Sequence, residues 1–311
     1  MALLYMSDGT NGEEWRQLMR AEIPDLDFRI HPEIGDPAEI AMTLIWRYKL
    51  HELKSFPNLK VIASLGAGVD HLVGEDRHFL PDGVPVVRLV DPSMTTQMIE
   101  WCLMAILNHL RRWDAYRALH RERRYEEIRV RQPAEVTIGV MGLGELGGNL
   151  AQALCRIGYR VRGWSRSAKN LDGIDCRHGW DGLANFLGDC DVVVCLLPLT
   201  PETEAILNAE TFAQMKPGAF VVNAARGRHI VDADLIAAID SGHIAGATLD
   251  VQRIEPMPGD DPFWFHPRIL TFPHVAAITI ATSCAPQVAE NYRRMNDGRP
   301  LLNLVDLERG Y

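Results

Sequence analysis

The sequence predicts an α/β protein of two domains, one of which is a doubly wound parallel sheet of the dinucleotide-binding type. Its length of 311 residues fits two domains of ordinary size. Short apolar runs alternate with helical patterns along most of the chain, as they do in α/β folds. Residues 136–154 combine an apolar run, a glycine-rich turn and a helical pattern, and the other elements are arranged around this stretch.

The glycine-rich turn has the sequence GLGELG and consists of Gly142, Leu143, Gly144, Glu145, Leu146 and Gly147. The first glycine permits a tight turn, the second lets the backbone approach a pyrophosphate, and the third lets helix and strand pack closely. A pyrophosphate would accept hydrogen bonds from the free N–H groups at the start of the helix. A glycine turn without a ligand is the alternative, but the strand at residues 136–141 and the helix after the turn favour dinucleotide binding.

The composition excludes several classes of protein. A hydrophobic content of 47% and a charged content of 23% are typical of a soluble protein with a full core. The net charge of −9 argues against nonspecific nucleic-acid binding. No signal peptide or membrane span is expected. The six cysteines form no C-x-x-C and the histidines no H-x-x-x-H, so we expect reduced thiols, no metal site and a cytoplasmic protein.

In the first domain, strands are expected at residues 2–6, 26–30, 42–46, 60–64 and 86–89, with a helix at 13–21. The fourth of these strands runs into LGAGVD, residues 65–70. Two glycines at the carboxyl end of a strand expose backbone N–H groups, which form a nest suited to a carboxylate. An ordinary strand-to-helix turn is the alternative.

Six strands are expected in the second domain, at residues 136–141, 159–164, 191–197, 219–223, 245–249 and 268–271. Thr200 before Pro201 indicates the start of one connecting helix, and Asp232 and Gly242 bracket another. A long helix at 97–113 precedes this domain. Residues 111–131 hold eight arginines, which indicate a solvated helix face or a subunit-contact arm more than an anion site.

The residues after the second strand of the glycine-turn domain predict the preferred cofactor. An acid at this place binds the ribose 2′-hydroxyl of NAD, whereas an arginine accommodates the 2′-phosphate of NADP. The strand ends in Ser165, Arg166 and Ser167, and no acid follows until Asp172. A guanidinium and two hydroxyls match a phosphate, so NADP(H) is preferred and NAD(H) remains possible. A basic surface turn is the alternative.

Three loops at the carboxyl ends of strands carry candidate catalytic residues. Arg226 follows the strand at 219–223, Glu255 follows the strand at 245–249, and His274 follows the last strand. Each alone could be a surface or loop residue. Together they supply a carboxylate binder, an acid and a histidine at the edge where open α/β sheets bind ligands.

The motifs GLGELG, LLPLTPETEAILN, NAARG, DVQRIEP and PHVAAIT, in this order, resemble the D-isomer-specific 2-hydroxyacid dehydrogenases. Within that family the chain is most similar to NADPH-dependent glyoxylate/hydroxypyruvate reductases. The resemblance covers essentially the whole chain. It implies a Rossmann-type domain, residues 98–285, inserted into a smaller flavodoxin-like βαβ substrate domain of residues 1–97 and 286–311. It also implies a homodimer built partly from the arginine-rich arm.

The resemblance assigns roles to individual positions. It places the carboxylate-binding arginine at Arg226, the supporting acid at Glu255 and the proton donor at His274. It implies substrate contacts at Trp46, Ala67, Gly68, Val69 and Arg226. Besides the glycine turn and Ser165–Ser167, it implies cofactor contacts at Leu197, Pro198, Thr203, Ala224, Ala225, Arg226, Asp250, His274 and Ala276.

These residue types suit the reduction of a small 2-oxo acid to a 2-hydroxy acid. Arg226 binds the carboxylate bidentately, and His274 as an imidazolium protonates the carbonyl oxygen. Glu255 favours the charged imidazole and orients it. The hydride comes from the cofactor.

Two departures and two rival functions remain open. Gln252 and Arg253 stand where the family commonly has a phenylalanine, and we expect them to alter the rim of the loop. Arg47 and Lys49 raise the possibility of a bulkier substrate or one with a second anionic group. The alternative is that both cations face solvent. The same fold also occurs in nucleotide-sensing corepressors and in dehydrogenases of formate or phosphite. The compact ends of the chain favour an enzyme over a corepressor.

Overall fold

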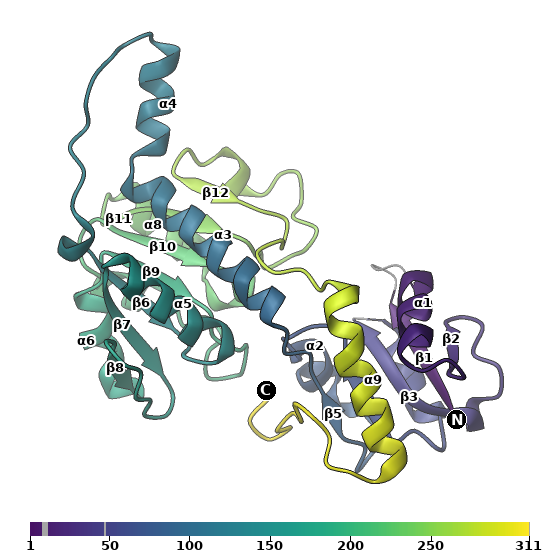
Figure 1. Cartoon of the computed structure of the whole chain (residues 1–311). Helices are drawn as coiled ribbons and strands as arrows, with labels where there is room; N and C mark the ends of the chain where they lie inside the picture. Colours follow the sequence, from purple (N-terminus) through teal and green to yellow (C-terminus); the bar gives the residue numbers. More distant parts are fainter. Residues whose placement is uncertain (8–11, 47, 311) are drawn as a thin grey trace. The chain divides into compact units, whose positions relative to one another are not determined.

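The computed structural model describes residues 1–7, 12–46 and 48–310 and divides into two compact units (Figure 1). One unit comprises Met1–Met94 and Thr279–Tyr311, and the other Thr95–Ile278. The chain therefore returns to the first unit earlier than the expected position 286. The reason is that Pro286 lies inside the helix α9 (Ala281–Asp297), which packs as a whole in the first unit. No helix among the described residues is long and apolar enough to cross a membrane.

The first unit contains a five-stranded parallel sheet in the order β2-β1-β3-β4-β5, the flavodoxin-like order that was expected. Its strands are β1 (Ala2–Ser7), β2 (Asp27–Ile30), β3 (Ile40–Trp46), β4 (Val61–Ser64) and β5 (Val86–Val87). Its helical segments are α1 (Gly12–Glu22), η1 (Pro37–Glu39), η2 (Leu50–Ser55), α2 (Asp70–Val73), η3 (Glu75–Phe79) and α9. After α9 the chain reaches the sheet edge, where Leu304 forms an antiparallel bridge with Val87.

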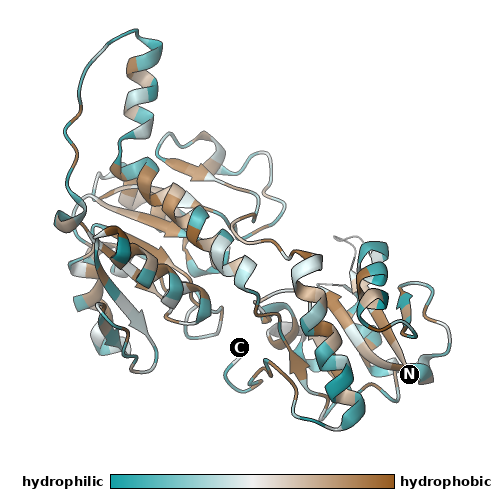
Figure 2. Ribbon diagram, in the orientation of Figure 1, coloured by the Kyte–Doolittle hydropathy of each residue, from teal (hydrophilic) through white to brown (hydrophobic). Residues whose placement is uncertain are grey.

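Both faces of this sheet are covered by apolar side chains. On one face, Leu3 and Leu44 pack with Trp15 of α1 and Val288 of α9. On the other face, alternate strand residues pack against η2 and α2. In Figure 2, β1 and β3 are accordingly brown, whereas α1 and α9 carry both hydrophilic and hydrophobic residues. Strands buried on both faces are typical of parallel sheets, which explains why their sequences read as continuous apolar runs.

The second unit contains a seven-stranded parallel sheet in the order β12-β11-β10-β9-β6-β7-β8. Its strands are β6 (Thr137–Met141), β7 (Arg160–Ser165), β8 (Asp175–His178), β9 (Val192–Cys195), β10 (Ala219–Asn223), β11 (Ile244–Leu249) and β12 (Ile269–Thr271). This is the doubly wound order of a Rossmann-type sheet, with the strand order reversing between β6 and β9. The sequence predicted six strands and missed β8, because this edge strand has no buried residue and reads as the polar stretch DCRH.

The helical segments of this unit lie on both faces of the sheet (Figure 1). They are α3 (Pro92–Leu110), α4 (Trp113–Arg121), η4 (Pro133–Glu135), α5 (Glu145–Ile157), η5 (Trp180–Gly182), α6 (Leu183–Gly188), α7 (Ala209–Gln214), η6 (Gly227–His229), α8 (Asp232–Asp240) and η7 (Pro262–Phe265). Side chains of α3 and α5 pack against Val192 and Val194, whereas α6, α7 and α8 pack against Val193 and Val221.

The long helix before this domain differs from the expected range of 97–113. It begins at Pro92, because Oδ1 of Asp91 accepts the N–H of Ser93 and proline suits the first helical position. It ends at Leu110, since Arg112 adopts a left-handed conformation with φ of 57°. The chain then forms α4, which projects from the sheet and whose side chains are almost all exposed.

The expected helix after Thr200 does not form. Residues 201–205 make a single hydrogen-bonded turn, in which the N–H of Glu204 donates to the carbonyl of Thr200. Ala205 then adopts a positive φ of 53°, which stops the helical path. The expected helix between Asp232 and Gly242 is present as α8.

Candidate active site

Two glycines of the turn between β6 and α5, Gly142 and Gly147, meet the requirements for a tight turn and for close packing that the sequence predicted. Gly142 has φ of 96°, and a Cβ there would lie 2.6 Å from the carbonyl oxygen of Leu196. A Cβ at Gly147 would lie 1.9 Å from the carbonyl oxygen of Gly142, so helix and strand can pack closely only with glycine there. At Gly144, by contrast, nothing lies within 4 Å of a Cβ. The packing of the protein therefore does not require a glycine at position 144. The space beside Gly144 is open to a ligand.

The start of α5 fits a pyrophosphate. Its N-cap residue is Gly144, and no side chain caps the helix. The N–H groups of the first turn therefore point outward at the positive end of the helix dipole, where an anion binds favourably. Leu146 packs toward the core, and the exposed Glu145 lies 3.4 Å from Nδ2 of Asn149. A dinucleotide held here would contact the backbone of Glu145 and Leu146.

The turn after β7 exposes Arg166 and Ser167, whereas Ser165 is buried. The Ser165 hydroxyl donates to the carbonyl oxygen of Ser167 at 2.8 Å, so it closes the turn. Arg166 and Ser167 are thus the polar side chains of this turn that face solvent, and the phosphate role of all three stays a prediction.

The loop after β9 is held by the candidate cofactor residue Thr203. Its Oγ1 donates to the carbonyl oxygen of Pro198 at 2.6 Å and accepts the N–H of Thr200 at 2.9 Å. Leu197, before the proline, is buried against the core. The loop therefore has a defined conformation at the carboxyl edge of the sheet, beside the glycine turn.

Arg226 lies in a turn that buried polar groups hold at the end of β10. The fully buried Asn223 accepts the N–H of Ala225 at 3.1 Å and donates to the carbonyl of Arg226 at 2.9 Å. Nη1 of Arg226 donates to the carbonyl of Ala225 at 2.7 Å. A Cβ at Gly227 would lie 2.0 Å from the carbonyl carbon of Gln252, so this glycine lets the turn touch the loop after β11.

Glu255 and His274 face each other across two loops. Nδ1 of His274 donates to Oε2 of Glu255 at 2.9 Å, and Oε1 of Glu255 accepts the N–H of Gln252 at 3.2 Å. Both side chains are partly exposed, at 29% for His274 and 21% for Glu255. Nε2 of His274 forms no hydrogen bond with the described residues, and its contact with a substrate stays a prediction. His274 has a φ of 57°, a conformation that is unusual for a residue with a side chain.

Asp250 supports this unusual conformation. Its carboxylate accepts the N–H groups of Val275 and Ala276 at 2.8 and 2.9 Å, and its carbonyl accepts the N–H of His274 at 2.7 Å. Burial raises the pKa of the Asp250 carboxyl above its ordinary value, and the two N–H groups oppose this shift. Through these hydrogen bonds Asp250 fixes the conformation of the loop that carries His274. The contact of Asp250 and Ala276 with a cofactor stays a prediction.

The expected effect of Gln252 and Arg253 on the loop rim is wrong for Gln252. This side chain is 8% exposed, and its Nε2 donates to the carbonyl oxygens of Phe272 and Leu249 at 3.1 and 3.4 Å. An amide can bridge two carbonyls, whereas a phenylalanine cannot. Arg253 is exposed and lies 3.6 Å from Asp232 at the start of α8.

In the first unit, the turn after β4 has the features of a carboxylate nest. Within the described residues the backbone N–H groups of Ala67, Gly68 and Val69 donate to no other group. Trp46 lies directly against this turn, since a Cβ at Gly66 would be 2.4 Å from its ring.

Trp46 also lies beside His71, with the two ring centroids 4.3 Å apart. Lys49, a candidate for binding a second anion, lies 3.5 Å from Glu52 and over the ring of Tyr48. Arg47, the other candidate, lies outside the described residues.

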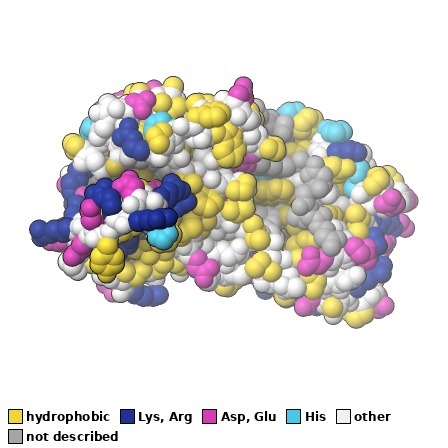
Figure 3. All heavy atoms as spheres, turned by 90° about the horizontal axis from the view of Figure 1, so that it is seen from above, with side chains coloured by type: hydrophobic (Ala, Val, Ile, Leu, Met, Phe, Trp, Pro, Cys, Tyr) yellow, Lys and Arg dark blue, Asp and Glu magenta, His cyan; other side chains and the backbone are white. Residues whose placement is uncertain are grey.

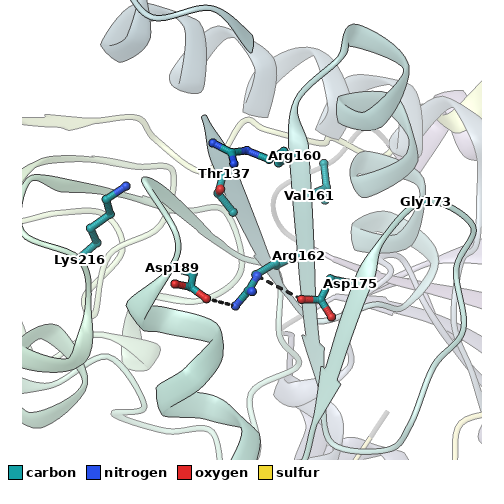
Figure 4. Close-up of a pocket in the computed structure, with 8 residues that line it drawn as sticks. All are labelled: Thr137, Arg160, Val161, Arg162, Gly173, Asp175, Asp189 and Lys216. Atoms are coloured by element: carbon teal, nitrogen blue, oxygen red, sulfur yellow. Dashed lines mark ion pairs between the residues drawn. The ribbon is translucent and has the colours of Figure 1, made fainter. Parts of the chain in front are cut away.

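A polar pocket at the opposite, amino edge of the second sheet carries no sign of catalysis (Figure 4). Arg162 is paired there with Asp175 at 3.2 Å and Asp189 at 2.5 Å. Lys216 lies 2.6 Å from the buried Asp191. Burial disfavours the charged form of Asp191, but hydrogen bonds from Arg131 and Lys216 outweigh it and lower its pKa to about 2. These pairs connect the starts of strands and are structural.

Comparison with known proteins agrees with this geometry. Residues 103–276 match the profile of the D-isomer specific 2-hydroxyacid dehydrogenase NAD binding domain. The chain is 39% identical to a glyoxylate/hydroxypyruvate reductase A of Serratia proteamaculans, over the whole of both chains.

Two solved structures are similar over nearly all of their length. A D-isomer specific 2-hydroxyacid dehydrogenase from Xanthobacter autotrophicus, in complex with NADPH and MES, is 44% identical, with a TM-score of 0.95 over 100% of this chain and 99% of that one. An NADPH-dependent glyoxylate/hydroxypyruvate reductase from Sinorhizobium meliloti, in complex with NADP and sulfate, is 35% identical, with a TM-score of 0.93 over all of both chains.

The fold and site thus define an oxidoreductase with a dinucleotide-binding domain. The chain belongs to the D-isomer specific 2-hydroxyacid dehydrogenase family.

Proposed function

We propose that this protein reduces small 2-oxo acids with NADPH, taking glyoxylate to glycolate and hydroxypyruvate to D-glycerate. The observation that carries the proposal is the pairing of His274 with Glu255 beside the Arg226 turn, in the unit that carries the glycine turn. Relatives named glyoxylate/hydroxypyruvate reductase over their full length support the choice of substrates.

The residues divide the work of the reaction. Arg226 binds the carboxylate of the 2-oxo acid and fixes the orientation of its carbonyl. His274, protonated on both nitrogens, donates through Nδ1 to Glu255 and gives its Nε2 proton to the carbonyl oxygen. Glu255 holds the ring and stabilises its positive charge. NADPH, when bound, supplies the hydride.

The preference for NADP(H) is supported by the exposed Arg166 and by the absence of an acid between Ser165 and Leu171. Two similar structures carry NADPH or NADP, which agrees with this preference. NADH remains a usable cofactor, since the glycine turn contacts only the part that both cofactors share.

Small substrates are favoured over those with a second anionic group. Trp46 lies against the glycine that precedes the nest, where a bulky ring limits the space for a substituent. Lys49 is paired with Glu52 and is therefore engaged within the protein. Among the described residues of this loop, no unpaired cation is left to bind the second carboxylate of a dicarboxylate.

A kinetic panel tests the function. Glyoxylate, hydroxypyruvate, phenylpyruvate and 2-oxoglutarate are each assayed with NADPH and with NADH, by the loss of absorbance of the reduced cofactor. We expect the highest kcat/KM with glyoxylate or hydroxypyruvate and NADPH. Rapid turnover of 2-oxoglutarate would show that a second anion is bound, and turnover of no 2-oxo acid would favour a binding protein of the same fold. Oxidation of formate or phosphite would indicate a formate or phosphite dehydrogenase instead.

We also propose a homodimer that uses the arm of residues 111–131. In α4, Trp113 is 56% exposed and Tyr116 37%, so this projecting helix leaves two large aromatic side chains uncovered. Figure 3 looks down on this projecting helix and shows charged side chains gathered at its tip with hydrophobic ones beside them. Light scattering on a size-exclusion column should give twice the chain mass, and a monomer would contradict the proposal.

A cytoplasmic location is proposed from the cysteines, all six of which are free thiols in the structure. Cell fractionation tests it.

A further inference from the structure

We propose that His229 is a positioning residue that ties the backbone of Arg226 to the carbonyl of Pro198, and so couples substrate binding to the cofactor loop. The inference rests on the proposed function, in which Arg226 binds the substrate carboxylate and Pro198 lies in a loop that contacts the cofactor. Neither composition nor motif spacing singled out this histidine.

His229 is the last residue of η6 and is completely buried. Its Nδ1 accepts the backbone N–H of Arg226 at 3.2 Å. Its Nε2 lies 3.3 Å from the carbonyl oxygen of Pro198, which belongs to the loop after the neighbouring strand β9. One ring therefore contacts the two segments that carry a candidate substrate residue and a candidate cofactor residue.

The hydrogen bonds select one protonation state of the ring. Nδ1 can accept the N–H of Arg226 only when it carries no proton, and Nε2 must then carry the proton that it donates to Pro198. The opposite tautomer would donate from Nδ1 to the Arg226 carbonyl, 3.1 Å away, and would turn a lone pair toward the Pro198 oxygen. That Arg226 carbonyl already accepts from Asn223. The Nε2–H tautomer thus satisfies more groups.

The surrounding backbone makes this link stiff. The N–H of Ala205 donates to the carbonyl of Arg228 at 2.8 Å, and the N–H of Leu207 donates to that of His229 at 2.9 Å. Arg228 also pairs with Glu204 at 3.0 Å. The Pro198 carbonyl accepts from Thr203 in addition to His229. Segments 198–207 and 226–230 are therefore held side by side by several hydrogen bonds, and His229 is the side chain among them that contacts both the Arg226 backbone and the Pro198 carbonyl.

Two amide substitutions separate the two halves of the link. In His229→Asn the amide oxygen lies near the place of Nδ1 and can still accept from Arg226, but it does not reach Pro198. In His229→Gln the longer amide reaches Pro198 as a donor, but it provides no acceptor at Nδ1. A residue that merely fills the core would lower stability in both variants without separating their effects on the two ligands.

The experiment measures the dissociation constant of NADPH by fluorescence titration and the KM of glyoxylate at saturating NADPH. We expect His229→Gln to raise the KM roughly three- to tenfold with NADPH binding nearly unchanged, the loss expected for one hydrogen bond. We expect His229→Asn to weaken NADPH binding by a similar factor with a nearly unchanged KM. Equal effects on both constants in both variants, or no effect in either, would overturn the proposal.

The matched control is His243→Gln. The Nε2 of His243 also contacts backbone carbonyls, those of Phe212 and Met215 at 2.9 and 3.1 Å, but at the amino edge of the same sheet. Both constants should stay within about twofold of the unaltered protein, because His243 contacts neither of the two loops that carry the candidate site residues.

A measurement on the unaltered protein does not depend on the folding of variants. Long-range proton–nitrogen NMR correlations should assign the Nε2–H tautomer to His229 at neutral pH, and an Nδ1–H tautomer or an imidazolium would overturn the proposal. If the unaltered protein reduces no 2-oxo acid, the proposed function fails, while the tautomer and the NADPH affinity of His229→Asn still decide whether the link to Pro198 exists.

Discussion

His274 and Glu255 form a hydrogen-bonded pair, with Nδ1 of the imidazole 2.9 Å from Oε2 of the carboxylate. The pair joins the loops that follow the neighbouring parallel strands β11 and β12, so it lies at the ligand-binding edge of the sheet. Because Nδ1 is held by the carboxylate, the ring presents Nε2 as its outward nitrogen. The roles of both residues can be tested separately.

Replacing His274 by glutamine should lower kcat for glyoxylate reduction by about 10²- to 10⁴-fold, the usual contribution of a general acid. The dissociation constant of NADPH should change little, since the glycine turn and Arg166 are untouched. His266→Gln is the matched control, because His266 precedes β12 at the amino edge, where its Nε2 lies 3.2 Å from Asp240. Unchanged turnover in His274→Gln would exclude it as the proton donor.

Replacing Glu255 by glutamine should lower kcat for glyoxylate reduction by about ten- to a hundredfold, the loss expected for a hydrogen bond between charged groups. The carboxylate of Glu255 accepts from Nδ1 of His274 and favours the positive charge of the proton donor, whereas a neutral amide of the same size does not. The measurement is kcat at saturating glyoxylate and NADPH, with Glu210→Gln on the exposed start of α7 as control. An unchanged kcat would refute the pairing as a source of charge stabilisation.

Replacing Arg226 by lysine should raise the KM of glyoxylate and lower kcat/KM by about ten- to a hundredfold, since an ammonium cannot form the bidentate contact with a carboxylate. Arg253→Lys serves as control, because Arg253 lies in the adjoining loop and pairs with Asp232 instead. The idea fails if the KM of the lysine variant at Arg226 stays close to that of the unaltered protein.

Replacing Arg166 by alanine should reduce the preference for NADPH over NADH by about tenfold or more, the worth of a hydrogen bond to a charged phosphate. The measurement is the ratio of kcat/KM for the two reduced cofactors at saturating glyoxylate. Lys169→Ala removes an exposed cation of the same loop and should leave the ratio nearly unchanged. A lower KM for NADH than for NADPH in the unaltered protein would contradict the cofactor assignment itself.

Much of the fold follows from local sequence signals, and the differences have local causes. The strands buried on both faces read as apolar runs: β10 was predicted to the residue, and β9 was predicted with one extra residue at its start and two at its end. The edge strand β8 was missed because its residues are polar and its place depends on pairing with β7. The helix expected after Thr200 was wrong because the positive φ of Ala205 has no signal in that residue type.

The candidate site shows the same division. Arg226, Glu255 and His274 could be named because their residue types suit the chemistry and their loops follow strands. Gln252 and His229 could not, because each acts through contacts with residues distant in the sequence: Gln252 with Phe272, and His229 with Pro198. A hydrogen bond between separate loops becomes visible only when the strands are in register.

The stability of the protein should fall between about pH 6.5 and pH 4, partly because of His109. This ring stacks on Phe220 with centroids 4.1 Å apart, and burial, reinforced by the charges of Arg112 and Arg131, lowers its pKa from 6.5 to about 4. Between these two pH values His109 takes up a proton in the unfolded chain but stays neutral in the folded chain, so acid favours unfolding. The shift corresponds to a loss on the order of 3 kcal/mol at pH 4 relative to neutral pH.

His109→Gln removes this titration while keeping a polar side chain of similar reach. We therefore expect the free energy of unfolding, measured by urea denaturation, to depend less steeply on pH in the variant between pH 6.5 and 4. Asp191, whose pKa is about 2, titrates below this window and affects both proteins equally. His120→Gln on the exposed α4 is the control and should leave the slope unaltered. The two curves of unfolding free energy against pH, for His109→Gln and for the unaltered protein, would contradict this account if they ran parallel between pH 6.5 and 4. His109 would then take up its proton equally readily in the folded and unfolded states, and the acid sensitivity would come from other groups.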